Sequence, residues 1–313
     1  MASKQIMRSL LCAALLIGLA FCSPAWAQDR PAPDPEQAAA QAVIRKLNAY
    51  VELLNRTLRA SESLARYASW ADMKSGPTGR ERIIYGLYSL YDVRGEIDKA
   101  RAATTTEPAL PELDAAIKSY IPTYEAVAPI ITEASAYYER QDYKTDAMAE
   151  GKALHAKLAP AAQGFLAERA KVEALFAREK AKSDAVELAL IEKTEGRKAR
   201  WHVASVMMQA RGIIDALPKP DKPVIDMAGF DAALGAFAAS VKDLDNYAAA
   251  NPGALSSFES RPRALLGKLR EFRDKLAQAK GDARRGAGRD LTWIVSDYNT
   301  MVSTASLAIR SAR

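Results

Sequence analysis

The chain has 313 residues, of which 49% are hydrophobic and 26% are charged, and its formal net charge is +6. After residue 27 it contains no run of 18 apolar residues and no cysteine, since Cys12 and Cys22 both lie in the N-terminal segment. We therefore expect no membrane-spanning helix after residue 27. Without a cysteine, that part of the chain cannot form a disulfide, a thiolate metal site or a cysteine nucleophile.

The N-terminus has the pattern of a secretory signal peptide. Lys4 and Arg8 precede 14 apolar residues, and the A-x-A sequence that ends at Ala27 follows them. We therefore predict that residues 1–27 are a signal peptide, cleaved after Ala27, and that the protein is periplasmic. The alternative is a lipid anchor on Cys22, although the preceding position, which is small in lipidation sites, holds Phe21.

The remaining sequence predicts an all-α fold. Residues 28–35 contain three prolines and are expected to form a disordered leader. From 36 to 313 the chain is predicted to be one all-helical domain, because Ala, Leu, Lys, Glu and Arg dominate while Val, Ile and Thr are sparse. A first helix is expected over 36–70, where apolar residues recur with a helical period.

A second helix is expected over residues 81–103. Thr78 and Glu81 have the spacing of a capping box, in which the threonine oxygen accepts a first-turn amide hydrogen and the glutamate reaches back to the threonine amide. Gly76 and Pro77 are expected to form the tight turn that precedes this helix.

One very long helix is expected in the middle of the chain. A third helix begins near residue 112, where Pro122 and Pro129 are expected to kink or split it. The next helical region covers 147–217, and its part at 161–217 has almost no strong helix breaker. A helix of that length measures about 75 Å or more. We therefore predict an elongated helical bundle, either undivided or made of two sub-bundles that share the 161–217 helix.

The C-terminal part is predicted to be helical and basic. Helices are expected over 226–250, over 261–280 and from 289 to the end. Residues 261–313 hold 12 Lys and Arg but five acidic residues, a net charge of +7. In a loop rich in glycine, Arg284, Arg285 and Arg289 are candidate contacts for an anionic lipid surface. The alternative is that these charges form the solvated face of ordinary helices. Nucleic acid is not expected as a partner of an exported protein.

Tyrosines are concentrated in the first half of the chain. Ten of the 12 fall between residues 50 and 143. Tyr85, Tyr88 and Tyr91 follow one another at a spacing of three, while Tyr120 and Tyr124 are one helical turn apart. Such stripes are typical of a seam between helices and also of a ligand groove. The five tyrosines are therefore the candidate lining of a groove, with a helix seam as the other interpretation.

The sequence contains no recognisable catalytic motif. His155 and His202 are 47 positions apart, and neither belongs to an E-x-x-H or H-E-x-x-H motif. Haem-attachment, nucleophile-elbow and nucleotide-binding patterns are also missing from the sequence. We therefore predict that the protein is not an enzyme and has no catalytic residue, bound metal or cofactor.

Four segments carry a resemblance to a known family. They are KLNAYVELLN, GPTGRERIIYGLYSLYD, YYERQDYKTD and VSDYNTMVS. Together they resemble the YiiG-like family of bacterial envelope proteins, a family of unknown function whose members are often described as lipoproteins. The resemblance covers nearly all of the chain after the leader. It implies an exported, all-helical protein with no assigned activity, and it supplies no catalytic residues. Phe21 departs from the lipoprotein members.

Two functions follow as expectations. The first is an exported, non-enzymatic helical protein of the cell envelope that acts as a scaffold or binding module, with an envelope protein or an anionic lipid surface as its partner. The alternative is a periplasmic carrier of a small ligand or lipid, bound in the groove lined by the tyrosines.

Overall fold

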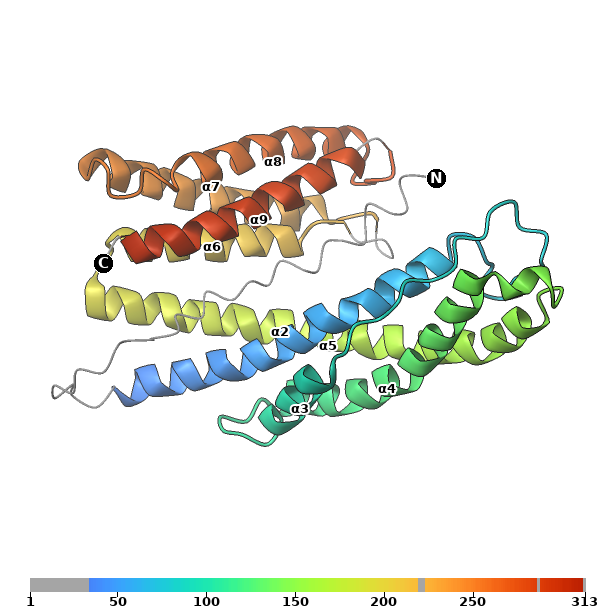
Figure 1. Ribbon diagram of the computed structural model, residues 1–313. Helices are drawn as coiled ribbons and strands as arrows, with labels where there is room; N and C mark the ends of the chain where they lie inside the picture. Colours follow the sequence, from blue (N-terminus) through green and yellow to red (C-terminus); the bar gives the residue numbers. More distant parts are fainter. Residues whose placement is uncertain (1–33, 219–222, 286–287, 312–313) are drawn as a thin grey trace. The chain divides into compact units, whose positions relative to one another are not determined.

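The computed structural model describes residues 34–218, 223–285 and 288–311, and all regular structure in these ranges is helical (Figure 1). The prediction of an all-α fold is therefore confirmed. The predicted signal peptide, its cleavage site and the alternative anchor at Cys22 lie outside the described residues. The helices are α2 (Pro35–Tyr67), α3 (Arg94–Ala103), α4 (Pro111–Arg140), α5 (Ala149–Glu195), α6 (Ala199–Asp215), α7 (Met227–Ala250), α8 (Ser260–Gln278) and α9 (Gly288–Ser311), with a short 3-10 helix, η2 (Asp142–Lys144).

The described residues up to Lys180 form one compact unit, and those from Ala181 onward form a second. The boundary falls inside α5. This helix has 47 residues, so the prediction of one very long helix is confirmed. Its predicted end near residue 217 is wrong, because Gly196 takes a left-handed conformation (φ +75°) that ends the helix.

The first unit is built around α2 and α4. The side chain of Asp34 accepts a hydrogen bond from the amide of Glu36 and caps α2, which therefore begins inside the predicted leader. The buried face of α2 includes Leu47 and Tyr50, and that of α4 includes Ile117, with none of these three side chains exposed to solvent. Burial of each large apolar side chain contributes about 1.5–3 kcal/mol. Despite its two internal prolines, α4 is a single helix.

The second unit is built from α6, α7, α8 and α9, which lie alongside one another (Figure 1). Their shared core includes Val206 of α6, Phe237 of α7, Phe272 of α8 and Met301 of α9. Asp226 caps α7 by accepting hydrogen bonds from the amides of residues 228 and 229. The helices predicted over 226–250, over 261–280 and from 289 onward are confirmed within a residue or two.

The predicted helix over 81–103 is wrong in its first half. Residues 80–93 are not helical, and α3 begins only at Arg94. Thr78 and Glu81 do make contact, since the Glu81 carboxylate accepts hydrogen bonds from the Thr78 amide at 2.5 Å and from the Thr78 hydroxyl at 2.8 Å. The pair closes a turn instead of starting a helix, because contacts with α2 hold the residues that follow in an extended conformation.

Candidate functional site

Residues 83–93 form an extended segment, here called the strap, which runs back along α2 from its C-terminal end (Figure 1). Side chains of α2, and of the turn that follows it, hold the strap backbone. Arg66 Nε donates to the Tyr85 carbonyl at 2.7 Å, and Trp70 Nε1 donates to the Gly86 carbonyl at 3.0 Å. Ser63 bonds the backbone of Tyr88 in both directions, as a donor at 3.1 Å and an acceptor at 3.0 Å.

Two further arginines extend this pattern toward the start of α2. The Nε atoms of Arg59 and Arg56 donate to the carbonyls of Ser89 and Asp92, each at 3.4 Å. Positions 56, 59, 63 and 66 recur every three or four residues and therefore lie on one face of α2. Side-chain donors spaced in this way along α2 bond to carbonyls of the strap. In a helix, the same carbonyls would accept hydrogen bonds from backbone amides instead.

The same arginines stack on the strap tyrosines. The guanidinium carbon of Arg59 lies 3.9 Å from the ring centroid of Tyr88, and that of Arg66 lies 4.4 Å from the same centroid. Arg56 stands 4.9 Å from the ring centroid of Tyr91. Cations within about 6 Å of an aromatic face are attracted by the ring. We call the set Arg56, Arg59, Arg66, Tyr85, Tyr88 and Tyr91 the arginine–tyrosine ladder.

The strap has a buried side and an exposed side. Leu87 and Val93 are buried, whereas Ile83, Tyr85 and Tyr91 are 51%, 49% and 53% exposed. Gly86 has a φ of +65°, and a Cβ there would lie 3.2 Å from the Cβ of Tyr138, so glycine is required by conformation and by space. The ladder is thus a fixed surface that presents aromatic rings to solvent.

The charges around the ladder are only partly paired. Arg59 is 3.1 Å from Glu62, and Arg56 is 3.8 Å from Glu96. Within the described parts of the chain, three arginines at the other end form no ion pair: Arg66, Arg80 and Arg82. The carboxylate of Glu81, between Arg80 and Arg82, is hydrogen-bonded to Thr78 and Gly79, so this end of the surface carries a net positive charge.

The five tyrosines of the predicted groove do not line one surface. Tyr120 and Tyr124 are 0% and 4% exposed and pack against Phe165, whereas the other three belong to the exposed ladder. The hydroxyl of Tyr120 lies 2.6 Å from Thr57 Oγ1 and accepts a hydrogen bond from Arg169 at 3.2 Å. Burial raises the pKa of Tyr124 to about 12. These two tyrosines belong to a packed seam between helices.

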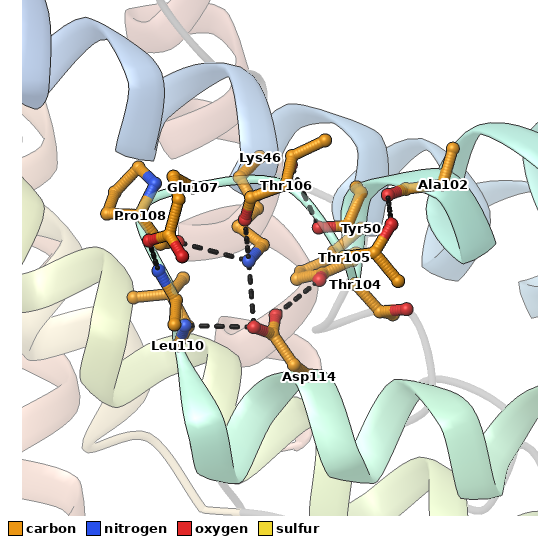
Figure 2. A network of polar contacts seen from close by, with 12 residues as sticks. Lys46, Tyr50, Ala102, Thr104, Thr105, Thr106, Glu107, Pro108, Leu110 and Asp114 are labelled. Atoms are coloured by element: carbon orange, nitrogen blue, oxygen red, sulfur yellow. Dashed lines mark hydrogen bonds and ion pairs between the residues drawn. The ribbon is translucent and has the colours of Figure 1, made fainter.

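A second polar network, shown in Figure 2, is buried between α2 and α4. Lys46 Nζ donates to Asp114 Oδ2 at 2.7 Å and to the carbonyls of Thr106 and Pro108 at 2.8 and 3.0 Å. The Tyr50 hydroxyl donates to the other carboxylate oxygen of Asp114 at 2.5 Å. Burial raises the pKa of Tyr50, so the phenol remains a donor. All three ammonium hydrogens are used, and the network therefore anchors the loop between α3 and α4 instead of offering a reactive amine.

Six of the nine basic residues of 261–313 whose side chains the structure describes lie within ion-pair distance of a carboxylate. Arg284 and Arg285 lie 2.7 and 3.7 Å from Asp282, whose pKa the Arg284 guanidinium lowers to about 2. The loop itself is tied to the chain before α7, since the Ala283 amide donates to the Pro223 carbonyl at 3.1 Å. Arg289 is the second residue of α9, and its side chain is outside the described residues. Other ion pairs on these helices are Arg263–Asp245, Lys268–Asp297, Arg273–Asp231 and Lys275–Asp290.

The two histidines are packing residues on different helices. The Tyr67 hydroxyl lies 3.0 Å from His155 Nδ1, and His202 packs on Tyr247 with ring centroids 4.5 Å apart. Burial lowers the pKa of both imidazoles. Within the described ranges, no three His, Cys, Asp or Glu side chains are placed to hold a metal ion. No helix in those ranges is long and apolar enough to cross a membrane.

The comparisons with known proteins agree with the resemblance carried by the four segments. A family model with the description "Protein of unknown function (DUF3829)" matches residues 41–305. The chain is also 29% identical over 273 residues to the "Uncharacterized protein YiiG" of Escherichia coli (strain K12), an alignment that covers 82% of this chain and 76% of that protein. No solved structure matches the chain.

Proposed function

The chain belongs to the DUF3829 family, and on that premise we propose that it is an exported, non-enzymatic protein of the bacterial cell envelope that acts as a scaffold or binding module for another protein. The observation that carries the proposal is the arginine–tyrosine ladder. Tyrosine and arginine are enriched in the energetically important parts of protein–protein interfaces. Here they are held in a fixed arrangement by backbone contacts before any partner binds.

A protein partner has more support than an anionic lipid surface. The +7 charge of residues 261–313 favoured a lipid surface, but four of its basic helix residues and two arginines of its loop are within ion-pair distance of carboxylates. The carboxylates of Asp245 and Asp231, which lie outside residues 261–313 and pair with Arg263 and Arg273, reduce the positive field that would draw this part of the chain to anionic lipids.

The carrier function has less support than the scaffold function. It depended on a groove lined by five tyrosines, of which Tyr120 and Tyr124 are packed in the core of the first unit. A ligand would have to displace Phe165, which is fully buried between them.

Native mass spectrometry of protein purified from its own periplasm tests the proposal. We expect a mature chain that begins after Ala27 and carries a bound protein. A chain that begins at a lipidated Cys22 would contradict the proposed processing. A monomer that uniformly retains a small molecule would contradict the binding-module function and favour a carrier.

A further inference from the structure

We infer that the arginine–tyrosine ladder, together with Arg80 and Arg82, docks an acidic segment of a partner protein that also carries aromatic side chains. The inference rests on the proposed function and adds to it the surface used and the chemistry of the partner. It is carried by the hydrogen bonding of the arginines, by the exposed rings, and by the uneven pairing of charge around the strap.

The hydrogen bonding leaves the arginines ready to bind carboxylates. Each ladder arginine donates its Nε to a strap carbonyl, which fixes the guanidinium and leaves its two terminal nitrogens for another acceptor. Arg59 shows the geometry within the chain, because its Nη1 donates to Glu62 Oε2 at 3.1 Å. A guanidinium presents a rigid fork of donors that suits a carboxylate. Carboxylates of a partner would meet Arg66 in the same manner.

The exposed rings add an apolar contact at small entropic cost. Tyr85 and Tyr91 are about half exposed, and arginine side chains already lie against their rings. Side chains fixed before binding lose less conformational freedom when a partner arrives. An aromatic side chain of the partner would stack on these rings beside the carboxylates.

The charges around the strap favour a protein segment over a continuous polyanion. Arg66, Arg80 and Arg82 form no ion pair among the described residues, but Glu62, Asp92 and Glu96 lie farther along the same surface, paired with arginines. A polyanionic glycan or lipid surface would bring negative charge against these carboxylates as well. A polypeptide can place its acidic residues opposite the unpaired arginines and an uncharged residue elsewhere.

Binding to defined polymers, measured by biolayer interferometry on the full mature chain, tests the inference. The probes are poly-L-glutamate, a random glutamate–tyrosine copolymer, dextran sulfate and phosphatidylglycerol vesicles. The variant Arg80→Gln/Arg82→Gln removes two charges without touching a strap hydrogen bond. Arg59→Gln/Arg66→Gln removes two members of the ladder. The matched control Arg101→Gln/Arg178→Gln removes two exposed arginines that pair with Glu125 and Glu112.

We expect the copolymer to bind more tightly than poly-L-glutamate, and each of the first two double variants to weaken copolymer binding about tenfold or more. The control should stay within about twofold. The inference would be overturned if the control variant weakened copolymer binding equally. It would also be overturned if dextran sulfate or the vesicles bound as tightly as the copolymer and depended equally on Arg80 and Arg82. A native protein complex that survives Arg80→Gln/Arg82→Gln would also overturn it while leaving the proposed function intact.

Discussion

The guanidinium group of Arg59, on α2, makes two contacts with the strap. Its central carbon lies 3.9 Å from the ring centroid of Tyr88, and its Nε donates a hydrogen bond to the carbonyl of the next residue, Ser89. One side chain thus holds an aromatic ring and the backbone of an extended segment. Arg56 and Arg66 repeat the arrangement one and two turns away along the same face. The period of α2 therefore determines the spacing at which the strap tyrosines are presented.

Replacing Arg66 by Ala is expected to loosen the strap and to lower the free energy of unfolding by about 1–2 kcal/mol, since a charge-assisted hydrogen bond and a ring contact are both lost. Arg66→Lys should recover less than half of this loss because an ammonium group lacks the planar fork. Urea denaturation measures the free energy of unfolding, and hydrogen exchange of the amides in 83–93 measures the loosening of the strap. Arg101→Ala, at an exposed ion pair, is the control. Unchanged exchange in the strap would contradict the ladder.

Breaking the buried Lys46–Asp114 pair is expected to be strongly destabilising. Lys46→Met leaves the Asp114 carboxylate buried without its cation, at a cost of about 3–5 kcal/mol. The double variant Lys46→Met/Asp114→Leu should be less destabilised than the sum of the single variants, because it leaves no unpaired charge. Tyr50→Phe should cost about 1.5–3 kcal/mol, because the lost hydrogen bond is donated to a carboxylate. Additive losses in the double-mutant cycle would mean that the two groups do not interact as Figure 2 shows.

Gly76 and Gly196 provide a matched test of packing around His155. Both are left-handed, with φ of +78° and +75°, so replacement by Ala should cost each about 1 kcal/mol of backbone strain. A Cβ at residue 76 would lie 2.7 Å from His155 Cδ2, whereas no heavy atom lies within 4 Å of a Cβ at residue 196. Overpacking should therefore add about 1–3 kcal/mol in Gly76→Ala alone. Equal denaturant midpoints for the two variants would place His155 elsewhere.

Stability is expected to fall as the pH drops from about 7.5 to about 5.5. Burial lowers the pKa of His155 and His202 in the folded chain, while in the unfolded chain each keeps its ordinary value of about 6.5. The unfolded state then binds more protons in this range, so the free energy of unfolding decreases with falling pH. His155→Gln/His202→Gln should flatten the slope. A steeper slope in the double variant, or a wild type that gains stability on acidification, would contradict the assignment.

Local patterns were sufficient to predict most helices. Apolar periodicity and breakers located α2, α7, α8 and α9, because their buried faces follow the sequence period. The strap was missed because a spacing of three suits both a helix and an extended chain with three residues per turn. Its conformation is decided by α2, and tertiary contacts of this kind override local propensity. The signal for it in the sequence is the spacing of arginines at 56, 59 and 66, on one face of the predicted first helix.

The buried Lys46 network could not be predicted from the sequence, for a different reason. Lys46 and Asp114 are 68 positions apart, and nothing in either segment identifies the other as its partner. The position of a lysine four residues before Tyr50, on an otherwise apolar face, was the available hint. The Tyr120–Arg169 contact is similarly remote, at 49 positions. Which tyrosines are buried and which are exposed therefore required the fold.

Photo-crosslinking in living cells tests the role of the ladder surface most directly. p-Benzoylphenylalanine is placed at Ile83, which is 51% exposed beside the ladder, or at Leu166 of α5, which is 42% exposed and serves as the control. We predict a protein adduct from position 83, in which the crosslinked peptide is acidic and contains an aromatic residue. This adduct should disappear in the Arg80→Gln/Arg82→Gln background. Identical adducts from both positions, or an adduct at position 83 that persists without the two arginines, would contradict a docking role for the ladder.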